Sequence, residues 1–443
     1  MSLTSPVPLV AGLATSAALA LSLALAPMSG AAEPTAREGG ASAGASVATT
    51  PGVLEKRTRT PFVFKGNGYG TSVEGGELPV DSSRLALSSM ACTTIAGKKN
   101  RNFVEESEIP GLGTVRGVFS RVVSKKKGGT TFQTSKHKVA EVVLADSPLG
   151  SLSISGVVST TRASFSAKDG WQASADTKIA GITFTPPVGD PQTIPIPSPG
   201  QTVPVPGLAN ITLGRTIEKP EPAKKRSRAY AVGVVVEVVP TGTTIKLARS
   251  MSKLERGFKT GIFGGSAIPV KAKVLGELVE VGRVVRQVMP CLGTDGELET
   301  SEAADVNLGD QVVVQAASAR QKGKQTNRRA VGTEVARIAE LDLGGGALVL
   351  DAIESRVKVT RLKSGKLKRS ASAKVGAITA GGGDAQSLEE LDGLEIPGVL
   401  KIETGLRKKI KDGIRMIGLR VTLLDGTGAV IDLATSKLSI ADR

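Results

Sequence analysis

The chain has few of the side chains on which most catalytic and metal sites depend. Its 443 residues include one histidine and two cysteines. A Ser–His–Asp system would have to use His137, and neither a nucleophile elbow nor a metal-binding cysteine spacing is present. Because His137 stands between Lys136 and Lys138, we expect it on the surface near a polar loop. We therefore expect a non-enzymatic protein that uses no cofactor and no metal.

Aromatic residues are also scarce, at 3% of the chain, whereas hydrophobic residues make up 40%. The cores must therefore be aliphatic, and the β-branched residues among them favour strands. The chain contains 53 glycines and 23 prolines, which favour frequent turns and disfavour long helices. This composition indicates a strand-rich protein.

The first residues have the pattern of an export signal, although no Lys or Arg precedes the apolar stretch. Residues 1–32 hold "LVAGLATSAALALSLALAP", followed by small residues suited to cleavage in "SGAAEP". Residues 33–61 are rich in Gly, Ala and Ser and are typical of a flexible spacer. We expect a secreted protein, and association with the cell envelope is a second form of this prediction. No transmembrane segment is expected after removal of the signal. Retention of the signal as an anchor is the alternative.

An internal repeat organises the rest of the chain. Cys92 aligns with Cys291 at an offset of 291 − 92 = 199, and Val236 aligns with Val421 at an offset of 421 − 236 = 185. The landmarks between them keep their order while the offset falls, which is typical of a duplicated unit with small deletions in its second copy. The predicted units are residues 62–255 and 257–440.

The repeat places the two cysteines in equivalent settings, "MACTT" and "MPCLG". Equivalent residues of two related lobes can meet at a pseudo-two-fold axis, and an exported protein meets an oxidising environment. We therefore predict a disulfide between Cys92 and Cys291. Two buried free thiols, each in its own core, are the alternative.

Alternation of apolar and polar residues predicts half-buried strands in both units. Leu152 and Ile154 share one face of "SLSISG", and Val234 and Val236 share one face of "VVVEVV". The proline-rich residues 185–207 should be an extended or edge segment, because proline removes backbone donors. We predict an all-β protein of two related sandwich-like units in a pseudo-two-fold arrangement. Whether the units exchange their closing hairpins is left open.

Basic segments give the chain a net charge of +16. Such surfaces attract polyanions through contacts that weaken with salt. The run "RLKSGKLKR" straddles a predicted hairpin tip at Ser364–Gly365, so its charges should project together. The basic runs contain no aromatic residue, which disfavours a nucleic-acid partner. The alternative interpretation is a solvated face. The candidate residues for binding an anionic cell-envelope polymer are Arg361, Lys363, Lys366, Lys368, Arg369, Lys408, Lys409 and Lys411.

Clustered carboxylates support a second function, hydrolysis of an envelope polysaccharide. A glycosidase needs two carboxylates about 5–10 Å apart in a cleft. One cluster is "VEESE", with Glu105, Glu106 and Glu108, and the other is "ELETSEAAD", residues 297–305. Solvated strand edges are the simpler explanation for both clusters.

Several quoted segments carry a resemblance to a known family. These are "GNGYGTSVEGGELPVDSS", "AGITFTPPVGDPQTIPIP", "VMPCLGTDG", "LDLGGGALVLDAI" and "GLRVTLLDGTGAVIDL". The chain resembles the choice-of-anchor P family of actinobacterial exported proteins over about residues 62–440. The resemblance implies export and a surface domain, and it implies neither an activity nor a binding residue.

Overall fold

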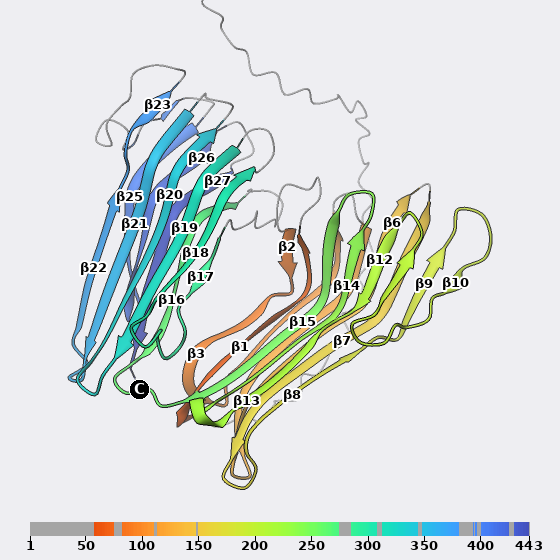
Figure 1. Cartoon of the computed structure of the whole chain (residues 1–443), viewed down its shortest axis with the longest axis horizontal. Coiled ribbons are helices and arrows are strands. Elements are labelled where there is room, and N and C mark those ends of the chain that lie inside the picture. Colours follow the sequence, from red (N-terminus) through yellow and green to blue (C-terminus); the bar gives the residue numbers. More distant parts are fainter. Residues whose placement is uncertain are drawn as a thin grey trace, which may run out of the picture. The chain divides into compact units, whose positions relative to one another are not determined.

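The computed structural model describes most of the chain from residue 57 onward (Figure 1). The predicted export signal and most of the predicted spacer lie outside the described residues, as do residues 381–392. The last residues of that spacer belong to the first strand, which begins at Thr58. The described residues are 57–74, 82–109, 113–147, 149–273, 285–307, 312–343, 348–380, 393, 395–396, 400–424 and 429–442.

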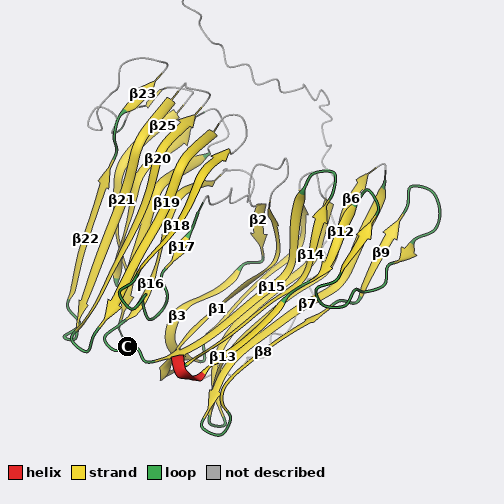
Figure 2. Cartoon of the chain, viewed as in Figure 1, coloured by secondary structure: helices red, strands yellow, loops and turns green. Residues whose placement is uncertain are grey.

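Strands account for nearly all the regular structure in these ranges (Figure 2). One short 3-10 turn, η1 (Pro222–Lys224), interrupts them. Among the described residues, no helix has the length and apolar character needed to cross a bilayer. The all-β prediction is therefore confirmed.

Lobe 1, residues 58–256, consists of two antiparallel sheets. Sheet A has the order β11-β12-β14-β15-β1-β2, with β13 beside β14 and β3 beside β1. Sheet B has the order β10-β9-β7-β6-β5-β4, with β8 beside β7. The strands are β1 (Thr58–Glu74), β2 (Ser82–Leu85), β3 (Ser88–Ala96), β4 (Lys99–Ile109), β5 (Gly113–Lys127), β6 (Thr130–Ser147), β7 (Gly150–Ser166), β8 (Gly170–Lys178), β9 (Gly181–Thr185), β10 (Gln192–Thr193), β11 (Thr202–Val205), β12 (Ala209–Leu213), β13 (Thr216–Glu221), β14 (Arg226–Val238) and β15 (Thr243–Arg256).

Lobe 2, residues 262–441, also consists of two antiparallel sheets. Sheet C has the order β17-β16-β27-β26-β25-β24, and sheet D has the order β18-β19-β20-β21-β22, with β23 beside β21. The strands are β16 (Ile262–Lys273), β17 (Gln287–Val288), β18 (Leu298–Asn307), β19 (Val312–Gln325), β20 (Arg329–Leu343), β21 (Leu348–Leu362), β22 (Leu367–Lys374), β23 (Ile378–Ala380), β24 (Glu395–Ile396), β25 (Leu400–Ile410), β26 (Gly413–Leu423) and β27 (Val430–Ala441).

The two lobes have the same pairing plan. In each, the first strand pairs with the last, β1 with β15 and β16 with β27. In each, a meander forms the second sheet, β4 to β8 in lobe 1 and β18 to β22 in lobe 2. The closing hairpins stay within their own lobes, so the exchange of hairpins that the sequence left open does not occur. A shared plan is what duplication requires, and common ancestry stays a prediction.

Aliphatic side chains fill the space between the sheets of each lobe. Leu152, Ile154, Val234 and Val236, which the alternating pattern placed inside, are all 0% exposed. The proline-rich segment 185–207 provides only the short edge strands β10 and β11, as its missing backbone donors predicted.

A line of left-handed residues, which we call the crease, crosses sheets B and D at matching positions. In lobe 1, Gly117 of β5 has φ 60° and Gly156 of β7 has φ 62°. In lobe 2, Ala316 of β19 has φ 47° and Ala352 of β21 has φ 48°. The offsets are 316 − 117 = 199 and 352 − 156 = 196, in step with the repeat. A left-handed backbone costs an alanine roughly 1–2 kcal/mol, so lobe 2 bears a strain that glycine spares lobe 1.

The middle of lobe 1 is polar, in contrast to the aliphatic clusters around it. His137 of β6 is 0% exposed and lies between Ser120 of β5 and Ser159 of β7. Its Nδ1 is 2.7 Å from the Ser120 hydroxyl oxygen. Burial lowers the pKa of His137 to about 3, and the positive charge of Arg249 adds to that shift. The surface position predicted for His137 is therefore wrong.

Candidate polyanion-binding site

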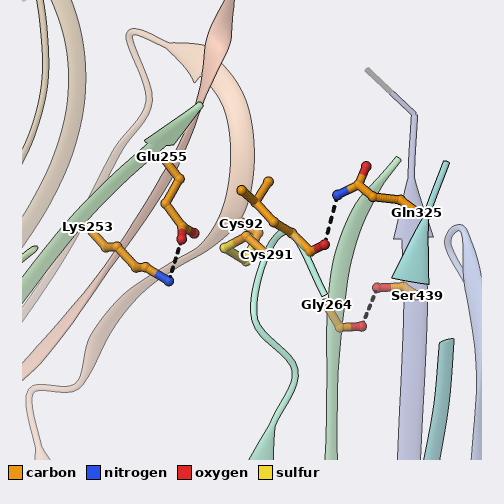
Figure 3. The surroundings of a disulfide bond; sticks show 8 residues. Cys92, Lys253, Glu255, Gly264, Cys291, Gln325 and Ser439 are labelled. Atoms are coloured by element: carbon orange, nitrogen blue, oxygen red, sulfur yellow. Dashed lines mark hydrogen bonds and ion pairs between the residues drawn. A yellow bond between two sulfur atoms is a disulfide. The ribbon is translucent and has the colours of Figure 1, made fainter. Parts of the chain in front are cut away.

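A disulfide between Cys92 and Cys291 joins β3 of lobe 1 to the segment after β17 in lobe 2 (Figure 3). Cys291 is fully buried, and the bridge packs in an apolar cluster with Val63 and Ile262. On the lobe 1 side, an ion pair joins Lys253 Nζ to Glu255 Oε1 at 2.7 Å. The predicted pairing of the cysteines is confirmed.

On the lobe 2 side, hydrogen bonds fix the segment that carries Cys291. Gln325 Nε2 donates to the carbonyl oxygen of Leu292 at 2.8 Å. The hydroxyl of Ser439 donates to the carbonyl oxygen of Gly264 at 2.9 Å and ties β27 to β16. The segment of Cys291 is also held directly, because the Phe263 amide donates to the carbonyl oxygen of Cys291 at 2.9 Å.

Three turns of lobe 2 carry exposed cations at the same end of the lobe. The turn between β19 and β20 meets the turn between β21 and β22, because the Lys363 amide donates to the Arg328 carbonyl at 2.9 Å. The turn between β21 and β22 is linked in turn to the turn between β25 and β26 through Arg361. We call the exposed cations in and beside these turns the basic tip cluster: Arg328, Lys363, Lys366, Lys409 and Lys411.

Arg361 holds this cluster together from inside the lobe. It is 4% exposed. Its Nη2 forms an ion pair with Asp412 Oδ1 at 2.7 Å, and its Nε donates to the Ile440 carbonyl at 2.7 Å. Its Nη1 donates to the Gly365 carbonyl at 3.3 Å. Arg361 was a candidate for ligand contact, but its side chain is committed to three partners and fixes the tips instead.

The other candidate residues fall into two groups. Lys363, Lys366, Lys368 and Lys408 are exposed, as are Lys409 and Lys411. Arg369 is only partly exposed, because it lies opposite Val359, which faces the core. The structure thus brings the tip lysines together and leaves Arg369 beside the interior.

Sequence reasoning missed a cationic pocket on the outer face of sheet D, along the strands β21 and β22 that meet at the turn with Lys363. Arg356 lies opposite Ser372, and Lys358 lies opposite Ser370. These side chains line a shallow cavity of about 290 Å³. Two cations beside two hydroxyls suit an anionic group such as a phosphate. The alternation of "ESRVKVT", with Val357 and Val359 inside, was the signal that could have located them.

A larger cavity of about 700 Å³ lies on the same sheet, along the crease. Alanines form much of its lining, and its charges are largely paired. Arg337 Nε forms an ion pair with Glu354 Oε2, and Arg320 with Glu302 at 3.6 Å. This cavity is therefore close to neutral, whereas the pocket at Arg356 and Lys358 is cationic.

The carboxylate clusters lie on different sheets. Glu105, Glu106 and Glu108 belong to β4 of sheet B, and residues 298–305 belong to β18 of sheet D. Glu106 Oε1 forms an ion pair with Arg116 Nε at 3.2 Å. Each cluster lies on an edge strand, and the two edge strands belong to different lobes.

No protein-family model and no curated protein matches the chain. Among solved structures, the β domain of the Bordetella autotransporter Brka aligns with 86% of this chain and 99% of its own, at 8% identity and a TM-score of 0.10. The WD40 domain of SCAP from fission yeast aligns with 86% of this chain and 98% of its own, at 7% identity and a TM-score of 0.11. Likenesses this weak carry no functional argument.

Proposed function

We propose that the chain is a non-enzymatic binding module, secreted or associated with the cell envelope, that contacts an anionic polymer through the basic tip cluster. The observation that carries this proposal is the gathering of exposed cations from three separate turns. In the described residues, Lys363, Lys366, Lys409 and Lys411 have no carboxylate partner. Unpaired like charges repel one another, and an external polyanion would offset that repulsion.

The pocket at Arg356 and Lys358 extends the same surface along sheet D. Both residues are exposed, and both lie on β21, the strand that leads into the turn with Lys363. A polymer with repeated anionic groups would engage tip and pocket at once, which raises its overall affinity above that of either contact. The resemblance to exported surface proteins supports an envelope polymer as the partner.

Retention on isolated cell-wall material, measured over a range of salt concentrations, tests the proposal. We expect retention to fall with salt, because screening weakens exposed contacts. Replacing Lys363, Lys366, Lys409 and Lys411 with glutamine should lower affinity tenfold or more. The matched control replaces four exposed lysines of lobe 1, at positions 126, 127, 168 and 178, and so removes equal charge. Equal losses in both variants, or retention that is independent of salt, would contradict a localised site.

A further inference from the structure

Lobe 2 buries a carboxylate that has no partner among the described residues. Glu334 of β20 is 0% exposed, and neither of its side-chain oxygens has a hydrogen bond. An unpaired buried carboxylate costs several kcal/mol, so natural structures rarely leave one uncompensated. The buried carboxylate therefore calls for a compensating group.

Glu334 ends a row of three oxygen-bearing side chains. Glu299 of β18 lies opposite Gln321 of β19, and Gln321 lies opposite Glu334. Residues paired in this way have Cβ atoms about 4.5–5.5 Å apart on one face of the sheet. Gln321 is 2% exposed. Three adjacent strands thus present their polar atoms side by side beneath sheet C.

The hydrogen bonds of Gln321 leave a second oxygen without a partner. Its Nε2 donates to Glu299 Oε2 and, at 3.4 Å, to the carbonyl oxygen of Val288. Its Oε1 is buried and accepts no hydrogen bond. Gly265 of β16 faces the row, and a Cβ there would lie 2.8 Å from Glu334 Oε1. The absence of a side chain at Gly265 gives the Glu334 carboxylate its space.

We propose that Glu334, Gln321 and Glu299 form a binding site for one calcium ion. The donors are all oxygens, which hard cations prefer, and the two carboxylates balance a divalent charge. The described residues contain no group of three His, Cys, Asp or Glu side chains suited to a metal. The site instead combines two carboxylates with an amide oxygen. Magnesium keeps several waters and suits a buried row less well.

The repeat supplies a comparison within the same chain. At an offset of 199, the positions of Glu299, Gln321 and Glu334 in lobe 1 hold Asn100, Val122 and Ser135. These three residues also lie opposite one another across strands β4, β5 and β6. Lobe 1 therefore has the same backbone row without the charge or the donor set. We expect one calcium ion per chain, in lobe 2.

Glu299 gives the site its route to solvent. It lies on the edge strand β18 and is partly exposed, whereas Gln321 and Glu334 are buried behind it. A proton is the competing occupant, because burial and the negative charge of Glu299 raise the pKa of Glu334 well above its usual value. The experiment must therefore separate calcium from a proton.

Calorimetric titration of chelator-treated full-length protein with CaCl₂ tests the site. We expect one calcium ion per chain and a rise in the unfolding temperature with calcium. Glu334→Gln should lower the affinity at least tenfold and abolish the stabilisation. Glu302→Gln is the matched control, since Glu302 shares strand β18 but is exposed and paired with Arg320. It should bind calcium as the unaltered protein does.

A second variant guards against misfolding of the first. Glu299→Gln lies at the partly exposed end of the row and should weaken calcium binding while the chain stays folded. The proposal is overturned if folded protein binds no calcium at millimolar concentration, or if Glu334→Gln binds it normally. It is also overturned if acidification from pH 8 to pH 5 stabilises the protein, calcium does not, and Glu334→Gln removes the effect of acid. A proton on Glu334 would then compensate the buried charge in place of calcium.

Discussion

The two lobes share a strand plan but fill their centres differently. The lobe 1 residues Ser120, His137, Ser159 and Ser250 align with Ala319, Ala336, Ser355 and Ser436 of lobe 2. In lobe 2 the Ser355 and Ser436 hydroxyl oxygens lie 2.8 Å apart and satisfy each other. Among the described residues of lobe 1, the hydroxyls of Ser159 and Ser250 have no partner, and neither does His137 Nε2.

This difference shows how one central side chain alters the bonding around it. Where alanine occupies the centre, two facing serines pair across the sheets. Where histidine occupies it, the ring fills the space against Gly68, and its Nε2 would lie 2.2 Å from a Cβ at that position. Buried polar groups without protein partners commonly bind internal water. The stability of lobe 1 therefore depends on His137 staying neutral. The stability of lobe 2 depends on a group that compensates the buried Glu334.

The largest expected effect comes from removing the link between the lobes. The disulfide joins residues separated by 199 positions. In the chain-entropy model, closing a loop of that length stabilises the folded state by about 5 kcal/mol. Replacing both cysteines with serine should therefore lower the urea midpoint strongly and allow the lobes to unfold in separate transitions. An unchanged urea midpoint in that variant, or in the reduced protein, would contradict this prediction.

Acid should destabilise lobe 1 through His137. Its folded-state pKa is lowered from 6.5 to about 3, so between these values the unfolded chain binds the proton more tightly. Stability is then lost as pH falls below 6.5, by up to about 1.4 kcal/mol per unit until pH approaches 3. Denaturation at pH 7, 5.5 and 4.5 would measure this loss.

His137→Ala, which gives lobe 1 the residue that lobe 2 has at Ala336, provides the control. The variant is expected to be less stable at pH 7 because it leaves a cavity. Its stability should nevertheless depend less steeply on pH than that of the unaltered protein. Parallel slopes for the two proteins would show that His137 is not the group responsible.

The smallest expected effect concerns the crease. A Cβ at Gly156 would lie 2.5 Å from the Cβ of Ala180, whereas lobe 2 reverses the pair, with alanine at Ala352 and glycine at Gly376. Gly156→Ala should cost roughly 2–3 kcal/mol through overlap and left-handed strain. Adding Ala180→Gly should restore the part of the lost stability that comes from the overlap.

A double-mutant cycle measures this recovery through urea midpoints. Ala180→Gly alone is the reference, because Ala180 lies in the connection between β8 and β9 that faces Gly156, and glycine there creates no overlap. Additive effects of the two substitutions would mean that the lobes do not share the geometry of the crease.

Period-two alternation predicted the strands and much of the core, and the same pattern explains the errors. His137 was assigned to the surface on the strength of its lysine neighbours. Alternation puts Lys136 and Lys138 outside and His137 inside. Arg361 likewise continues the inward series of Val357 and Val359. In both cases the prediction followed the polarity of the residue, whereas its position in the strand decides which side it faces.

Other features had no local signal in the sequence. Left-handed Ala316 and Ala352 cannot be recognised from composition, because alanine disfavours positive φ. Only their alignment with Gly117 and Gly156 through the repeat could have identified them. The cysteine pair was predictable because the repeat supplied a long-range relation that local patterns lack. The unpartnered oxygens of Glu334 depend on packing between sheets and could not be read from the chain.

The strand β18, which has acidic but no basic residues, closes one border of sheet D. A second copy approaching this border in antiparallel fashion would have to lay carboxylates such as Glu299 and Glu302 beside carboxylates of its own. Like-charge contact of this kind discourages growth of a continuous ribbon from chain to chain. If chains gather along a polymer as proposed, they would therefore remain separate particles, and acidification that neutralises this border is the condition under which fibres should first form.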